Sequence, residues 1–476
     1  MNDIIHLAPF ASGIYGAALE VGTNSVYPGT TVPTPLRLCW ALRRAAPCCQ
    51  KAAPEATSRQ RCCSCCCPPR GNVEGDNCCG LDEYALRRAV ASASAPSPRL
   101  LWATWKNNGL VTSPPMAVLV DLECEQLVVT IRGTWDLKDC ITDILSVPEF
   151  FDPFGWAGLT TAGEASDSAA ASSEQIEQGL YAHRGFLHSA EDAQQRLAVE
   201  GVLERALGPE GEACGYPVVF TGHSLGAGVA CLLALRLRAS LLDLGARDVR
   251  YVGFEPPGST LSQRLLEETQ RLGWCSAVCA YDWIPRLSVS SVQGIRKQVV
   301  RQLEVCSHSK LEIVLLSLAG FFRTLRFIPR CLRLPLEVLF TCLGGGPLVL
   351  DEDGAPRSCQ SCQACSLGKP LVPELWVPGN IVYFRPVAEE SWCCGWYERN
   401  TDFVAEWVQP EDLREIILSY RSVEMHFPNI FQYAYGRAAC RLGLDGGIDR
   451  EGGFSTGSCS ECSDDGSDDE SAENSW

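Results

Sequence analysis

Residues Gly222-His223-Ser224-Leu225-Gly226 form a G-x-S-x-G motif between an expected strand, Pro217–Thr221, and an expected helix, Leu225–Leu242. A serine in this context sits on a tight turn, and the flanking glycines let strand and helix approach because no Cβ intervenes. The free N–H groups of the helix N-terminus can stabilise an oxyanion. The alternative is an N-cap serine in a glycine-rich turn. The context on both sides favours a nucleophile at Ser224, with Gly222, His223 and Gly226 forming its elbow.

A serine nucleophile needs a base, usually histidine, and in enzymes with this motif the acid and then the histidine follow the serine. The chain has six histidines, of which only His308 and His426 follow Ser224. His426 comes after the last expected strand, Asn380–Arg385, where a base on a loop is expected. We therefore predict His426 as the base; the alternative is a surface histidine at a helix end.

Two acidic residues end apolar stretches and could orient that base. Asp282 follows Ala277–Tyr281, and Glu255 follows Tyr251–Phe254. The carboxyl ends of parallel strands are where such chemistry is found. We predict Asp282 as the acid and keep Glu255 as the competing candidate; a plain turn aspartate ahead of a proline is the other reading of Asp282.

Strands alternating with helices predict an α/β fold with a mainly parallel sheet. Buried strands are indicated by continuous apolar or β-branched runs. Ordered structure is expected at Leu100–Trp105 and Met116–Leu122. The expected strands are Leu127–Ile131, Pro217–Thr221, Val249–Phe254, Ser276–Tyr281 and Asn380–Arg385, and further helices are expected over 186–207 and Pro410–Arg421.

The net charge of −17 over 476 residues argues against a nucleic-acid partner, which would need a basic face. The N-terminus has no basic region, so we expect no secretory signal. Residues 313–322 are apolar but too short to cross a bilayer of about 30 Å. These features predict a cytoplasmic protein that is soluble or attached peripherally to a membrane.

Cysteine is abundant, with 27 in the chain, and clustered, most densely over Cys62–Cys67. Without a secretion signal, a disulfide framework is not expected. Cys359 and Cys362 have the spacing of half a zinc site, but no second pair accompanies them, so we expect no metal. The Cys62–Cys67 cluster fits a low-complexity loop, with reversible acylation as the alternative.

Taken together, these residues resemble the class 3 (fungal-type) lipases, and within them the sn-1-specific diacylglycerol lipases in the short form without four N-terminal transmembrane helices. The resemblance is carried by LVVTIRGTWDLKDCITDIL (127–145), by AHRGF (182–186), by the elbow and by MHFP (425–428). It covers roughly residues 1–25 and 98–440, with gaps.

The resemblance implies an α/β-hydrolase fold and a Ser224–Asp282–His426 triad. It implies an oxyanion hole formed by the N–H groups of Leu225 and Thr134, although Arg132-Gly133-Thr134 also reads as a plain turn. Glu255 departs from the family, which has a small polar residue before the two prolines.

The implied organisation is an N-terminal segment of the lipase domain (1–25), a Cys/Ala/Pro-rich flexible insertion (26–98), a catalytic domain (99–440) and an acidic disordered tail (441–476). Within the catalytic domain we expect a lid over 146–180 and an insertion over 306–375. Three Phe and a Trp in Phe150–Trp156 suit a lid or an interfacial anchor, or packing under a loop. The basic and apolar segment 321–333 suits an anionic membrane surface.

The expected activity is hydrolysis of diacylglycerol to a fatty acid and a monoacylglycerol. The resemblance implies a glycerolipid substrate, a membrane surface as partner, no required cofactor and stimulation by calcium. The alternatives are a triacylglycerol lipase or phospholipase of the same family, or an inactive membrane-associated scaffold. A scaffold would have no need of the histidine.

Overall fold

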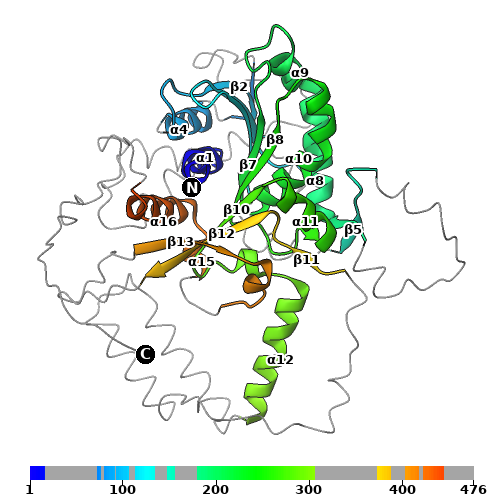
Figure 1. Ribbon diagram of the computed structural model, residues 1–476, viewed down its shortest axis with the longest axis vertical. Helices are drawn as coiled ribbons and strands as arrows, with labels where there is room; N and C mark the ends of the chain where they lie inside the picture. Colours follow the sequence, from blue (N-terminus) through cyan, green and yellow to red (C-terminus); the bar gives the residue numbers. More distant parts are fainter. Residues whose placement is uncertain are drawn as a thin grey trace, which may run out of the picture.

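The computed structural model describes residues 1–16, 72–76, 80–91, 93–106, 113–133, 147–155, 179–305, 373–387, 402–417 and 422–443. In this part of the chain, a nine-stranded sheet has the order β1-β2-β3-β4-β7-β8-β10-β12-β13 (Figure 1). The strands are β1 (Val73–Glu74), β2 (Arg99–Thr104), β3 (Met116–Asp121), β4 (Gln126–Ile131), β7 (Val218–His223), β8 (Val249–Phe254), β10 (Cys275–Cys279), β12 (Asn380–Val387) and β13 (Asp402–Val408). The consecutive pairs from β4 to β12 are parallel, while β2, β3 and β4 pair antiparallel, as do β12 and β13. The expected α/β fold with a mainly parallel sheet is confirmed.

A second, smaller sheet has the order β11-β9-β6-β5. It consists of short antiparallel strands, β5 (Pro148–Phe150), β6 (Tyr181–His183), β9 (Leu261–Ser262) and β11 (Leu375–Trp376).

Helices cover both faces of the large sheet, because its central strands are apolar on both sides. In β4, Leu127, Val129 and Ile131 join one core cluster, and Val128 joins the other. The first cluster includes α8 (Arg184–Glu200) and α10 (Leu225–Asp243), and the second includes α1 (Asn2–Gly13), α4 (Leu81–Val90) and α16 (Pro428–Arg441) (Figure 1).

Helix α10 is the one described helix that is long and apolar enough to cross a membrane. Its side chains from Leu225 to Leu235 are buried, and it packs against β7, β8 and α8. It is thus a core helix of this domain.

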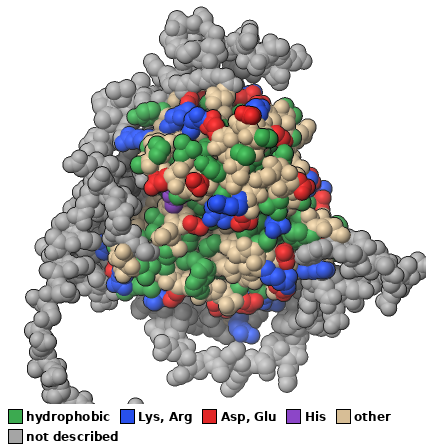
Figure 2. All heavy atoms as spheres, turned by 45° about the horizontal axis from the view of Figure 1, so that its top comes forward, with side chains coloured by type: hydrophobic (Ala, Val, Ile, Leu, Met, Phe, Trp, Pro, Cys, Tyr) green, Lys and Arg blue, Asp and Glu red, His purple; other side chains and the backbone are tan. Residues whose placement is uncertain are grey.

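The remaining described helices are short or peripheral: α9 (Val202–Leu207), α11 (Gln263–Arg271), α12 (Val289–Val305), α15 (Ser422–Met425) and the 3-10 turns Ile284–Arg286 and Pro410–Leu413. Figure 1 shows α12 extending away from the sheet. On the described part of the face in Figure 2, acidic and basic side chains are interspersed.

The structure corrects three expectations. The helix expected over 186–207 is two helices, because Gly201 has a left-handed φ of 57° and ends α8. The helix expected over Pro410–Arg421 is wrong within its described part, where a 3-10 turn ends at Leu413. The carbonyls of Asp412 and Glu415 accept hydrogen bonds from the Arg286 guanidinium.

The flexible insertion was expected to extend from residue 26 to residue 98, but β1 and α4 lie within this range and belong to the folded domain. Helix α4 packs on α1, where a Cβ added at Gly13 would lie 2.8 Å from the Ala89 Cβ. Its charges follow the helix dipole, with Asp82 in the first turn and Arg88 in the last. The Cys62–Cys67 cluster, segment 321–333 and the acidic tail lie outside the described residues.

Candidate active site

Ser224 lies at the junction of the last residue of β7 and the first residue of α10. Its φ is 57° and its ψ is −132°, a backbone conformation that L-residues rarely adopt and that is typical of functional sites. A hydrogen bond to the neighbouring strand stabilises this conformation: the Ser224 N–H donates to the Phe254 carbonyl of β8 over 2.9 Å. The side chain is about 1% exposed, so the hydroxyl lies inside the protein.

Glycine is required on both sides of this turn. A Cβ at Gly222 would lie 2.6 Å from the carbonyl oxygens of Ile131 and Gly226. A Cβ at Gly226 would lie 2.3 Å from the Ile131 oxygen and 2.8 Å from the Gly133 nitrogen. These contacts are all with backbone atoms, so the strand, the turn and the end of β4 can meet only if both positions lack a side chain.

His426 joins Ser224 to Asp282. Its Nε2 lies 2.8 Å from the Ser224 Oγ, and its Nδ1 lies 2.7 Å from the Asp282 Oδ2. Since a carboxylate can only accept, Nδ1 carries the proton and Nε2 is left to accept from the serine hydroxyl. The structure therefore brings together the serine, histidine and aspartate that the sequence predicted, across more than two hundred residues of chain.

Neighbouring structure holds both Asp282 and His426 in place. Asp282 follows β10, is fully buried, and accepts at Oδ1 from the Ile284 N–H over 3.0 Å. His426 lies between α15 and α16, and α16 is held in the core by fully buried Phe431. The base therefore sits on a short turn between two elements rather than on a long loop.

Only half of the expected oxyanion hole lies among the described residues. Leu225 is the first residue of α10, so its N–H is one of those that helix geometry leaves without an intrahelical acceptor. Thr134 is outside the described residues. Gly133, directly before it, adjoins the nucleophile: a Cβ there would lie 3.1 Å from the Ser224 Cβ.

Glu255, the competing acid, also ends its strand and has a positive φ of 50°. Its oxygens accept from the Cys279 N–H at 2.8 and 3.1 Å, and Oε1 accepts from the Tyr435 hydroxyl at 3.3 Å. Burial, and then the neighbouring Asp282 carboxylate, raises the pKa of Glu255 well above its ordinary value. The hydrogen bond from His426 goes to Asp282, so Asp282 is the acid that orients the base and Glu255 is its neighbour. His308, the competing base, is outside the described residues.

The elbow residue His223 makes two contacts that sequence reasoning missed. Its Nδ1 lies 2.7 Å from the Tyr15 hydroxyl, and its Nε2 lies 2.8 Å from the main-chain oxygen of His426. No local sequence pattern links Tyr15 to His223, which lies 208 positions further along the chain. The sequence therefore carries no signal that would have found this contact.

His183 has a structural role at the start of α8. It is the N-cap of α8, where its Nδ1 accepts from the Phe186 N–H at 3.3 Å, and its ring stacks on Phe186 with centroids 3.8 Å apart.

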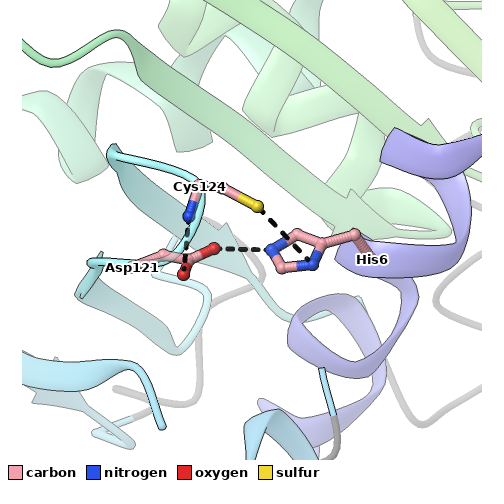
Figure 3. Close-up of side chains that lie close together, drawn as sticks. All are labelled: His6, Asp121 and Cys124. Atoms are coloured by element: carbon pink, nitrogen blue, oxygen red, sulfur yellow. Dashed lines mark hydrogen bonds and ion pairs between the residues drawn. The ribbon is translucent and has the colours of Figure 1, made fainter. Parts of the chain in front are cut away.

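His6, Asp121 and Cys124 form a second cluster, with ligand-type atoms within 4.8 Å of one another (Figure 3). The His6 Nε2 faces Asp121 at 2.5 Å, whereas its Nδ1 faces the Cys124 sulfur at 3.9 Å. A histidine offers one nitrogen to one ion, and the Asp121 oxygens already accept from Ser94 and Gln126. The cluster docks α1 onto the end of β3.

The described residues of the aromatic segment after β4 differ in their burial. Phe151 is 5% exposed and packs in the first core cluster, so for this residue packing under a loop is the better account. Val147 and Phe150 are exposed by 64% and 56%. Trp156 and most of the expected lid are outside the described residues.

Residues 128–292 match the family model described as Lipase (class 3). Diacylglycerol lipase-alpha of Homo sapiens is 27% identical over 364 residues, which cover 76% of this chain and 30% of that protein. Diacylglycerol lipase-beta of Mus musculus is 32% identical over 206 residues, covering 42% of this chain and 26% of that protein. The chain thus spans less than a third of the length of these relatives.

Solved structures of fungal lipases are similar as well. A Rhizomucor miehei lipase–propeptide complex is 21% identical with a TM-score of 0.31, covering 41% of this chain and 53% of that chain. A lipase from Rhizopus microsporus var. chinensis is 19% identical with a TM-score of 0.31, covering 43% and 59%.

The parallel sheet and the strand–Ser224–helix elbow define an α/β-hydrolase fold. Within that class, residues 128–292 are similar to the class 3 lipases, a family of carboxylic ester hydrolases.

Proposed function

We propose that this chain is a serine lipase that hydrolyses an ester of diacylglycerol through an acyl-enzyme on Ser224. The observation that carries the proposal is the position of His426, within 2.8 Å of the Ser224 Oγ and 2.7 Å of the Asp282 Oδ2. A nucleophile bonded to a base, and a base bonded to an orienting acid, is the arrangement that nucleophilic catalysis requires. A hydroxyl with no such base is a weak nucleophile.

In the first half-reaction, the Ser224 Oγ attacks the ester carbonyl carbon and the His426 Nε2 takes the hydroxyl proton. The buried Asp282 carboxylate stabilises the imidazolium that forms. The tetrahedral oxyanion is stabilised by the N–H of Leu225, and we assign the second donor to the N–H of Thr134. Collapse breaks the bond to the glycerol oxygen, which receives the proton from Nε2. Monoacylglycerol leaves and the acyl group stays on Ser224.

In the second half-reaction, the His426 Nε2 takes a proton from water, and the resulting hydroxide equivalent attacks the acyl carbon. Collapse releases the fatty acid, and the Ser224 Oγ regains its proton from Nε2. The steps use only residues of this chain and water, so the reaction needs no cofactor.

Diacylglycerol as substrate is supported by the names of the relatives, diacylglycerol lipase-alpha and -beta. Because such lipids partition into bilayers, the enzyme has to work at a lipid surface. The exposed Val147 and Phe150 side chains supply apolar surface for that contact. We propose a peripheral membrane protein of the cytoplasm. The six cysteines that the structure describes are free thiols, which suits a reducing compartment.

The test is fatty-acid release from diacylglycerol in mixed micelles by the wild type and by Ser224→Ala. We expect the wild type to hydrolyse diacylglycerol in preference to triacylglycerol and phospholipid, and the variant to lose at least about a thousandfold. Equal inactivity of both proteins on every glycerolipid would contradict the proposal and favour a scaffold.

A further inference from the structure

A chain of two hydrogen bonds runs from the N-terminal helix to the backbone of His426. The Tyr15 hydroxyl lies 2.7 Å from the Nδ1 of His223, and the Nε2 of His223 lies 2.8 Å from the carbonyl oxygen of His426. Tyr15 is 3% exposed and His223 is 2% exposed, so water competes little for either bond.

The direction of each bond follows from the groups involved. A carbonyl oxygen can only accept, so the His223 Nε2 must carry a hydrogen. In a neutral imidazole the other nitrogen is then an acceptor, and the Tyr15 hydroxyl donates to it. Burial, and then the neighbouring His426, holds the pKa of His223 well below its ordinary value, so the ring is neutral at pH 7. Tyr15 thereby selects the one tautomer that can bond to His426.

The packing around these groups leaves them little freedom. The Tyr15 ring meets the His223 ring edge-on with centroids 5.6 Å apart. The His223 ring also contacts the rings of His426, at 4.7 Å, and Phe431, at 5.2 Å. A Cβ at Gly133 would lie 2.5 Å from both the Tyr15 hydroxyl oxygen and the His223 carbonyl oxygen. Tyr15 therefore adjoins the end of β4, next to the segment assigned to the oxyanion hole.

We propose that Tyr15 and His223 are positioning residues that hold the main chain of His426, and through it the imidazole, in register with Ser224 and Asp282. The proposal rests on the proposed function, because positioning has a kinetic meaning only if His426 is the base. It makes the turn after α1, which lies outside the matched region 128–292, a part of the catalytic apparatus. His426 needs such a support because it sits in a turn between α15 and α16.

Tyr15→Phe removes one hydroxyl and keeps the ring. We expect kcat to fall about tenfold with KM changed less than twofold, because a lost neutral hydrogen bond misplaces the base without touching the lipid site. The control is Phe10→Leu, which loosens the packing of α1 without touching the hydrogen bonds; it should lower Tm at least as much and leave kcat within twofold. A kcat for Tyr15→Phe that matches the wild type would overturn the proposal.

His223 offers a second pair of variants. In His223→Gln the amide can donate to the His426 carbonyl and accept from Tyr15, whereas His223→Leu can do neither. We expect the Gln variant to keep at least fivefold more kcat than the Leu variant at similar Tm. Equal kcat for the two folded variants would contradict a hydrogen-bonding role.

A spectroscopic readout separates this inference from the proposed function. In wild-type protein labelled with ¹⁵N-histidine, the His223 signals at pH 7 should be those of a neutral ring protonated at Nε2. Tyr15→Phe should lose that fixed tautomer. If the wild type hydrolyses no lipid, the proposed function fails while this test of the hydrogen bonds stands. An unchanged His223 spectrum in Tyr15→Phe overturns the inference even if the enzyme is active.

Discussion

Glu255 and Asp282 are two fully buried carboxyl groups that follow the neighbouring parallel strands β8 and β10. Both residues bond to the backbone of Cys279: its N–H donates to the Glu255 carboxyl group, and its carbonyl oxygen accepts from the Asp282 backbone N–H at 3.0 Å. Two like charges this close cannot both persist in a dry interior, so one carboxyl group keeps its proton. Asp282 is bonded to His426, and Glu255 is the group whose pKa rises.

This arrangement predicts that stability falls as the pH rises. The unfolded Glu255 loses its proton above about pH 4.5, while the folded side chain keeps it until its raised pKa is passed. Between those two values the unfolding free energy drops by roughly 1.4 kcal/mol per pH unit from this group. Glu255→Gln mimics the protonated acid, so its stability relative to the wild type should increase as the pH rises above about 4.5. Urea unfolding at several pH values measures the difference, and a difference independent of pH would contradict the assignment.

The elbow predicts a sharp contrast between two glycines. Gly226→Ala places a methyl group 2.3 Å from the Ile131 oxygen, so backbone must move. We expect a loss of about 2–4 kcal/mol of unfolding free energy and loss of activity. In Gly436→Ala, within α16, the added Cβ meets nothing within 4 Å. That control should gain roughly 0.5–1 kcal/mol, because glycine is a poor helix former. Thermal unfolding that ranks the two variants equally would contradict the close approach at the elbow.

The exposed apolar side chains at β5 predict a defect confined to lipid surfaces. Phe150→Ser should reduce hydrolysis of micellar diacylglycerol severalfold and leave hydrolysis of a water-soluble ester unchanged, because only the first substrate requires insertion at an interface. Val199, 79% exposed in the last turn of α8, provides the matched control. Val199→Ser should leave both activities unaltered. Equal losses on both substrates would instead make Phe150 a structural residue.

The central fold was predictable wherever local pattern and burial agree. The strand expected over Val249–Phe254 has those bounds, because every residue in it except Arg250 is buried. Strand β13 was missed because it is an edge strand whose polar and apolar residues mix, and it exists through its pairing with β12. The segment from Pro410 was predicted as a helix but forms a 3-10 turn. The Asp412 carbonyl accepts a hydrogen bond from Arg286, which is distant in sequence, so the local sequence does not reveal this contact.

The active site likewise has a part that the sequence predicts and a part that it does not. The order of Ser224, Asp282 and His426 could be inferred because each follows or opens a regular element at the carboxyl edge of the sheet. The contacts of Tyr15 and the proximity of Glu255 to Asp282 depend on how α1 and the strand ends pack. Those contacts join residues with no shared motif, and only the three-dimensional structure brings them together.

The most direct measurement is the site of the acyl-enzyme. Protein mixed with a short-chain diacylglycerol or an activated fatty-acid ester is quenched in acid within one turnover, and its peptides are analysed by mass spectrometry. The account predicts an acyl group on the peptide at Ser224 in the wild type, and none in Ser224→Ala or in folded His426→Ala. An acyl group on another residue, or steady hydrolysis by Ser224→Ala at the wild-type rate, would contradict it.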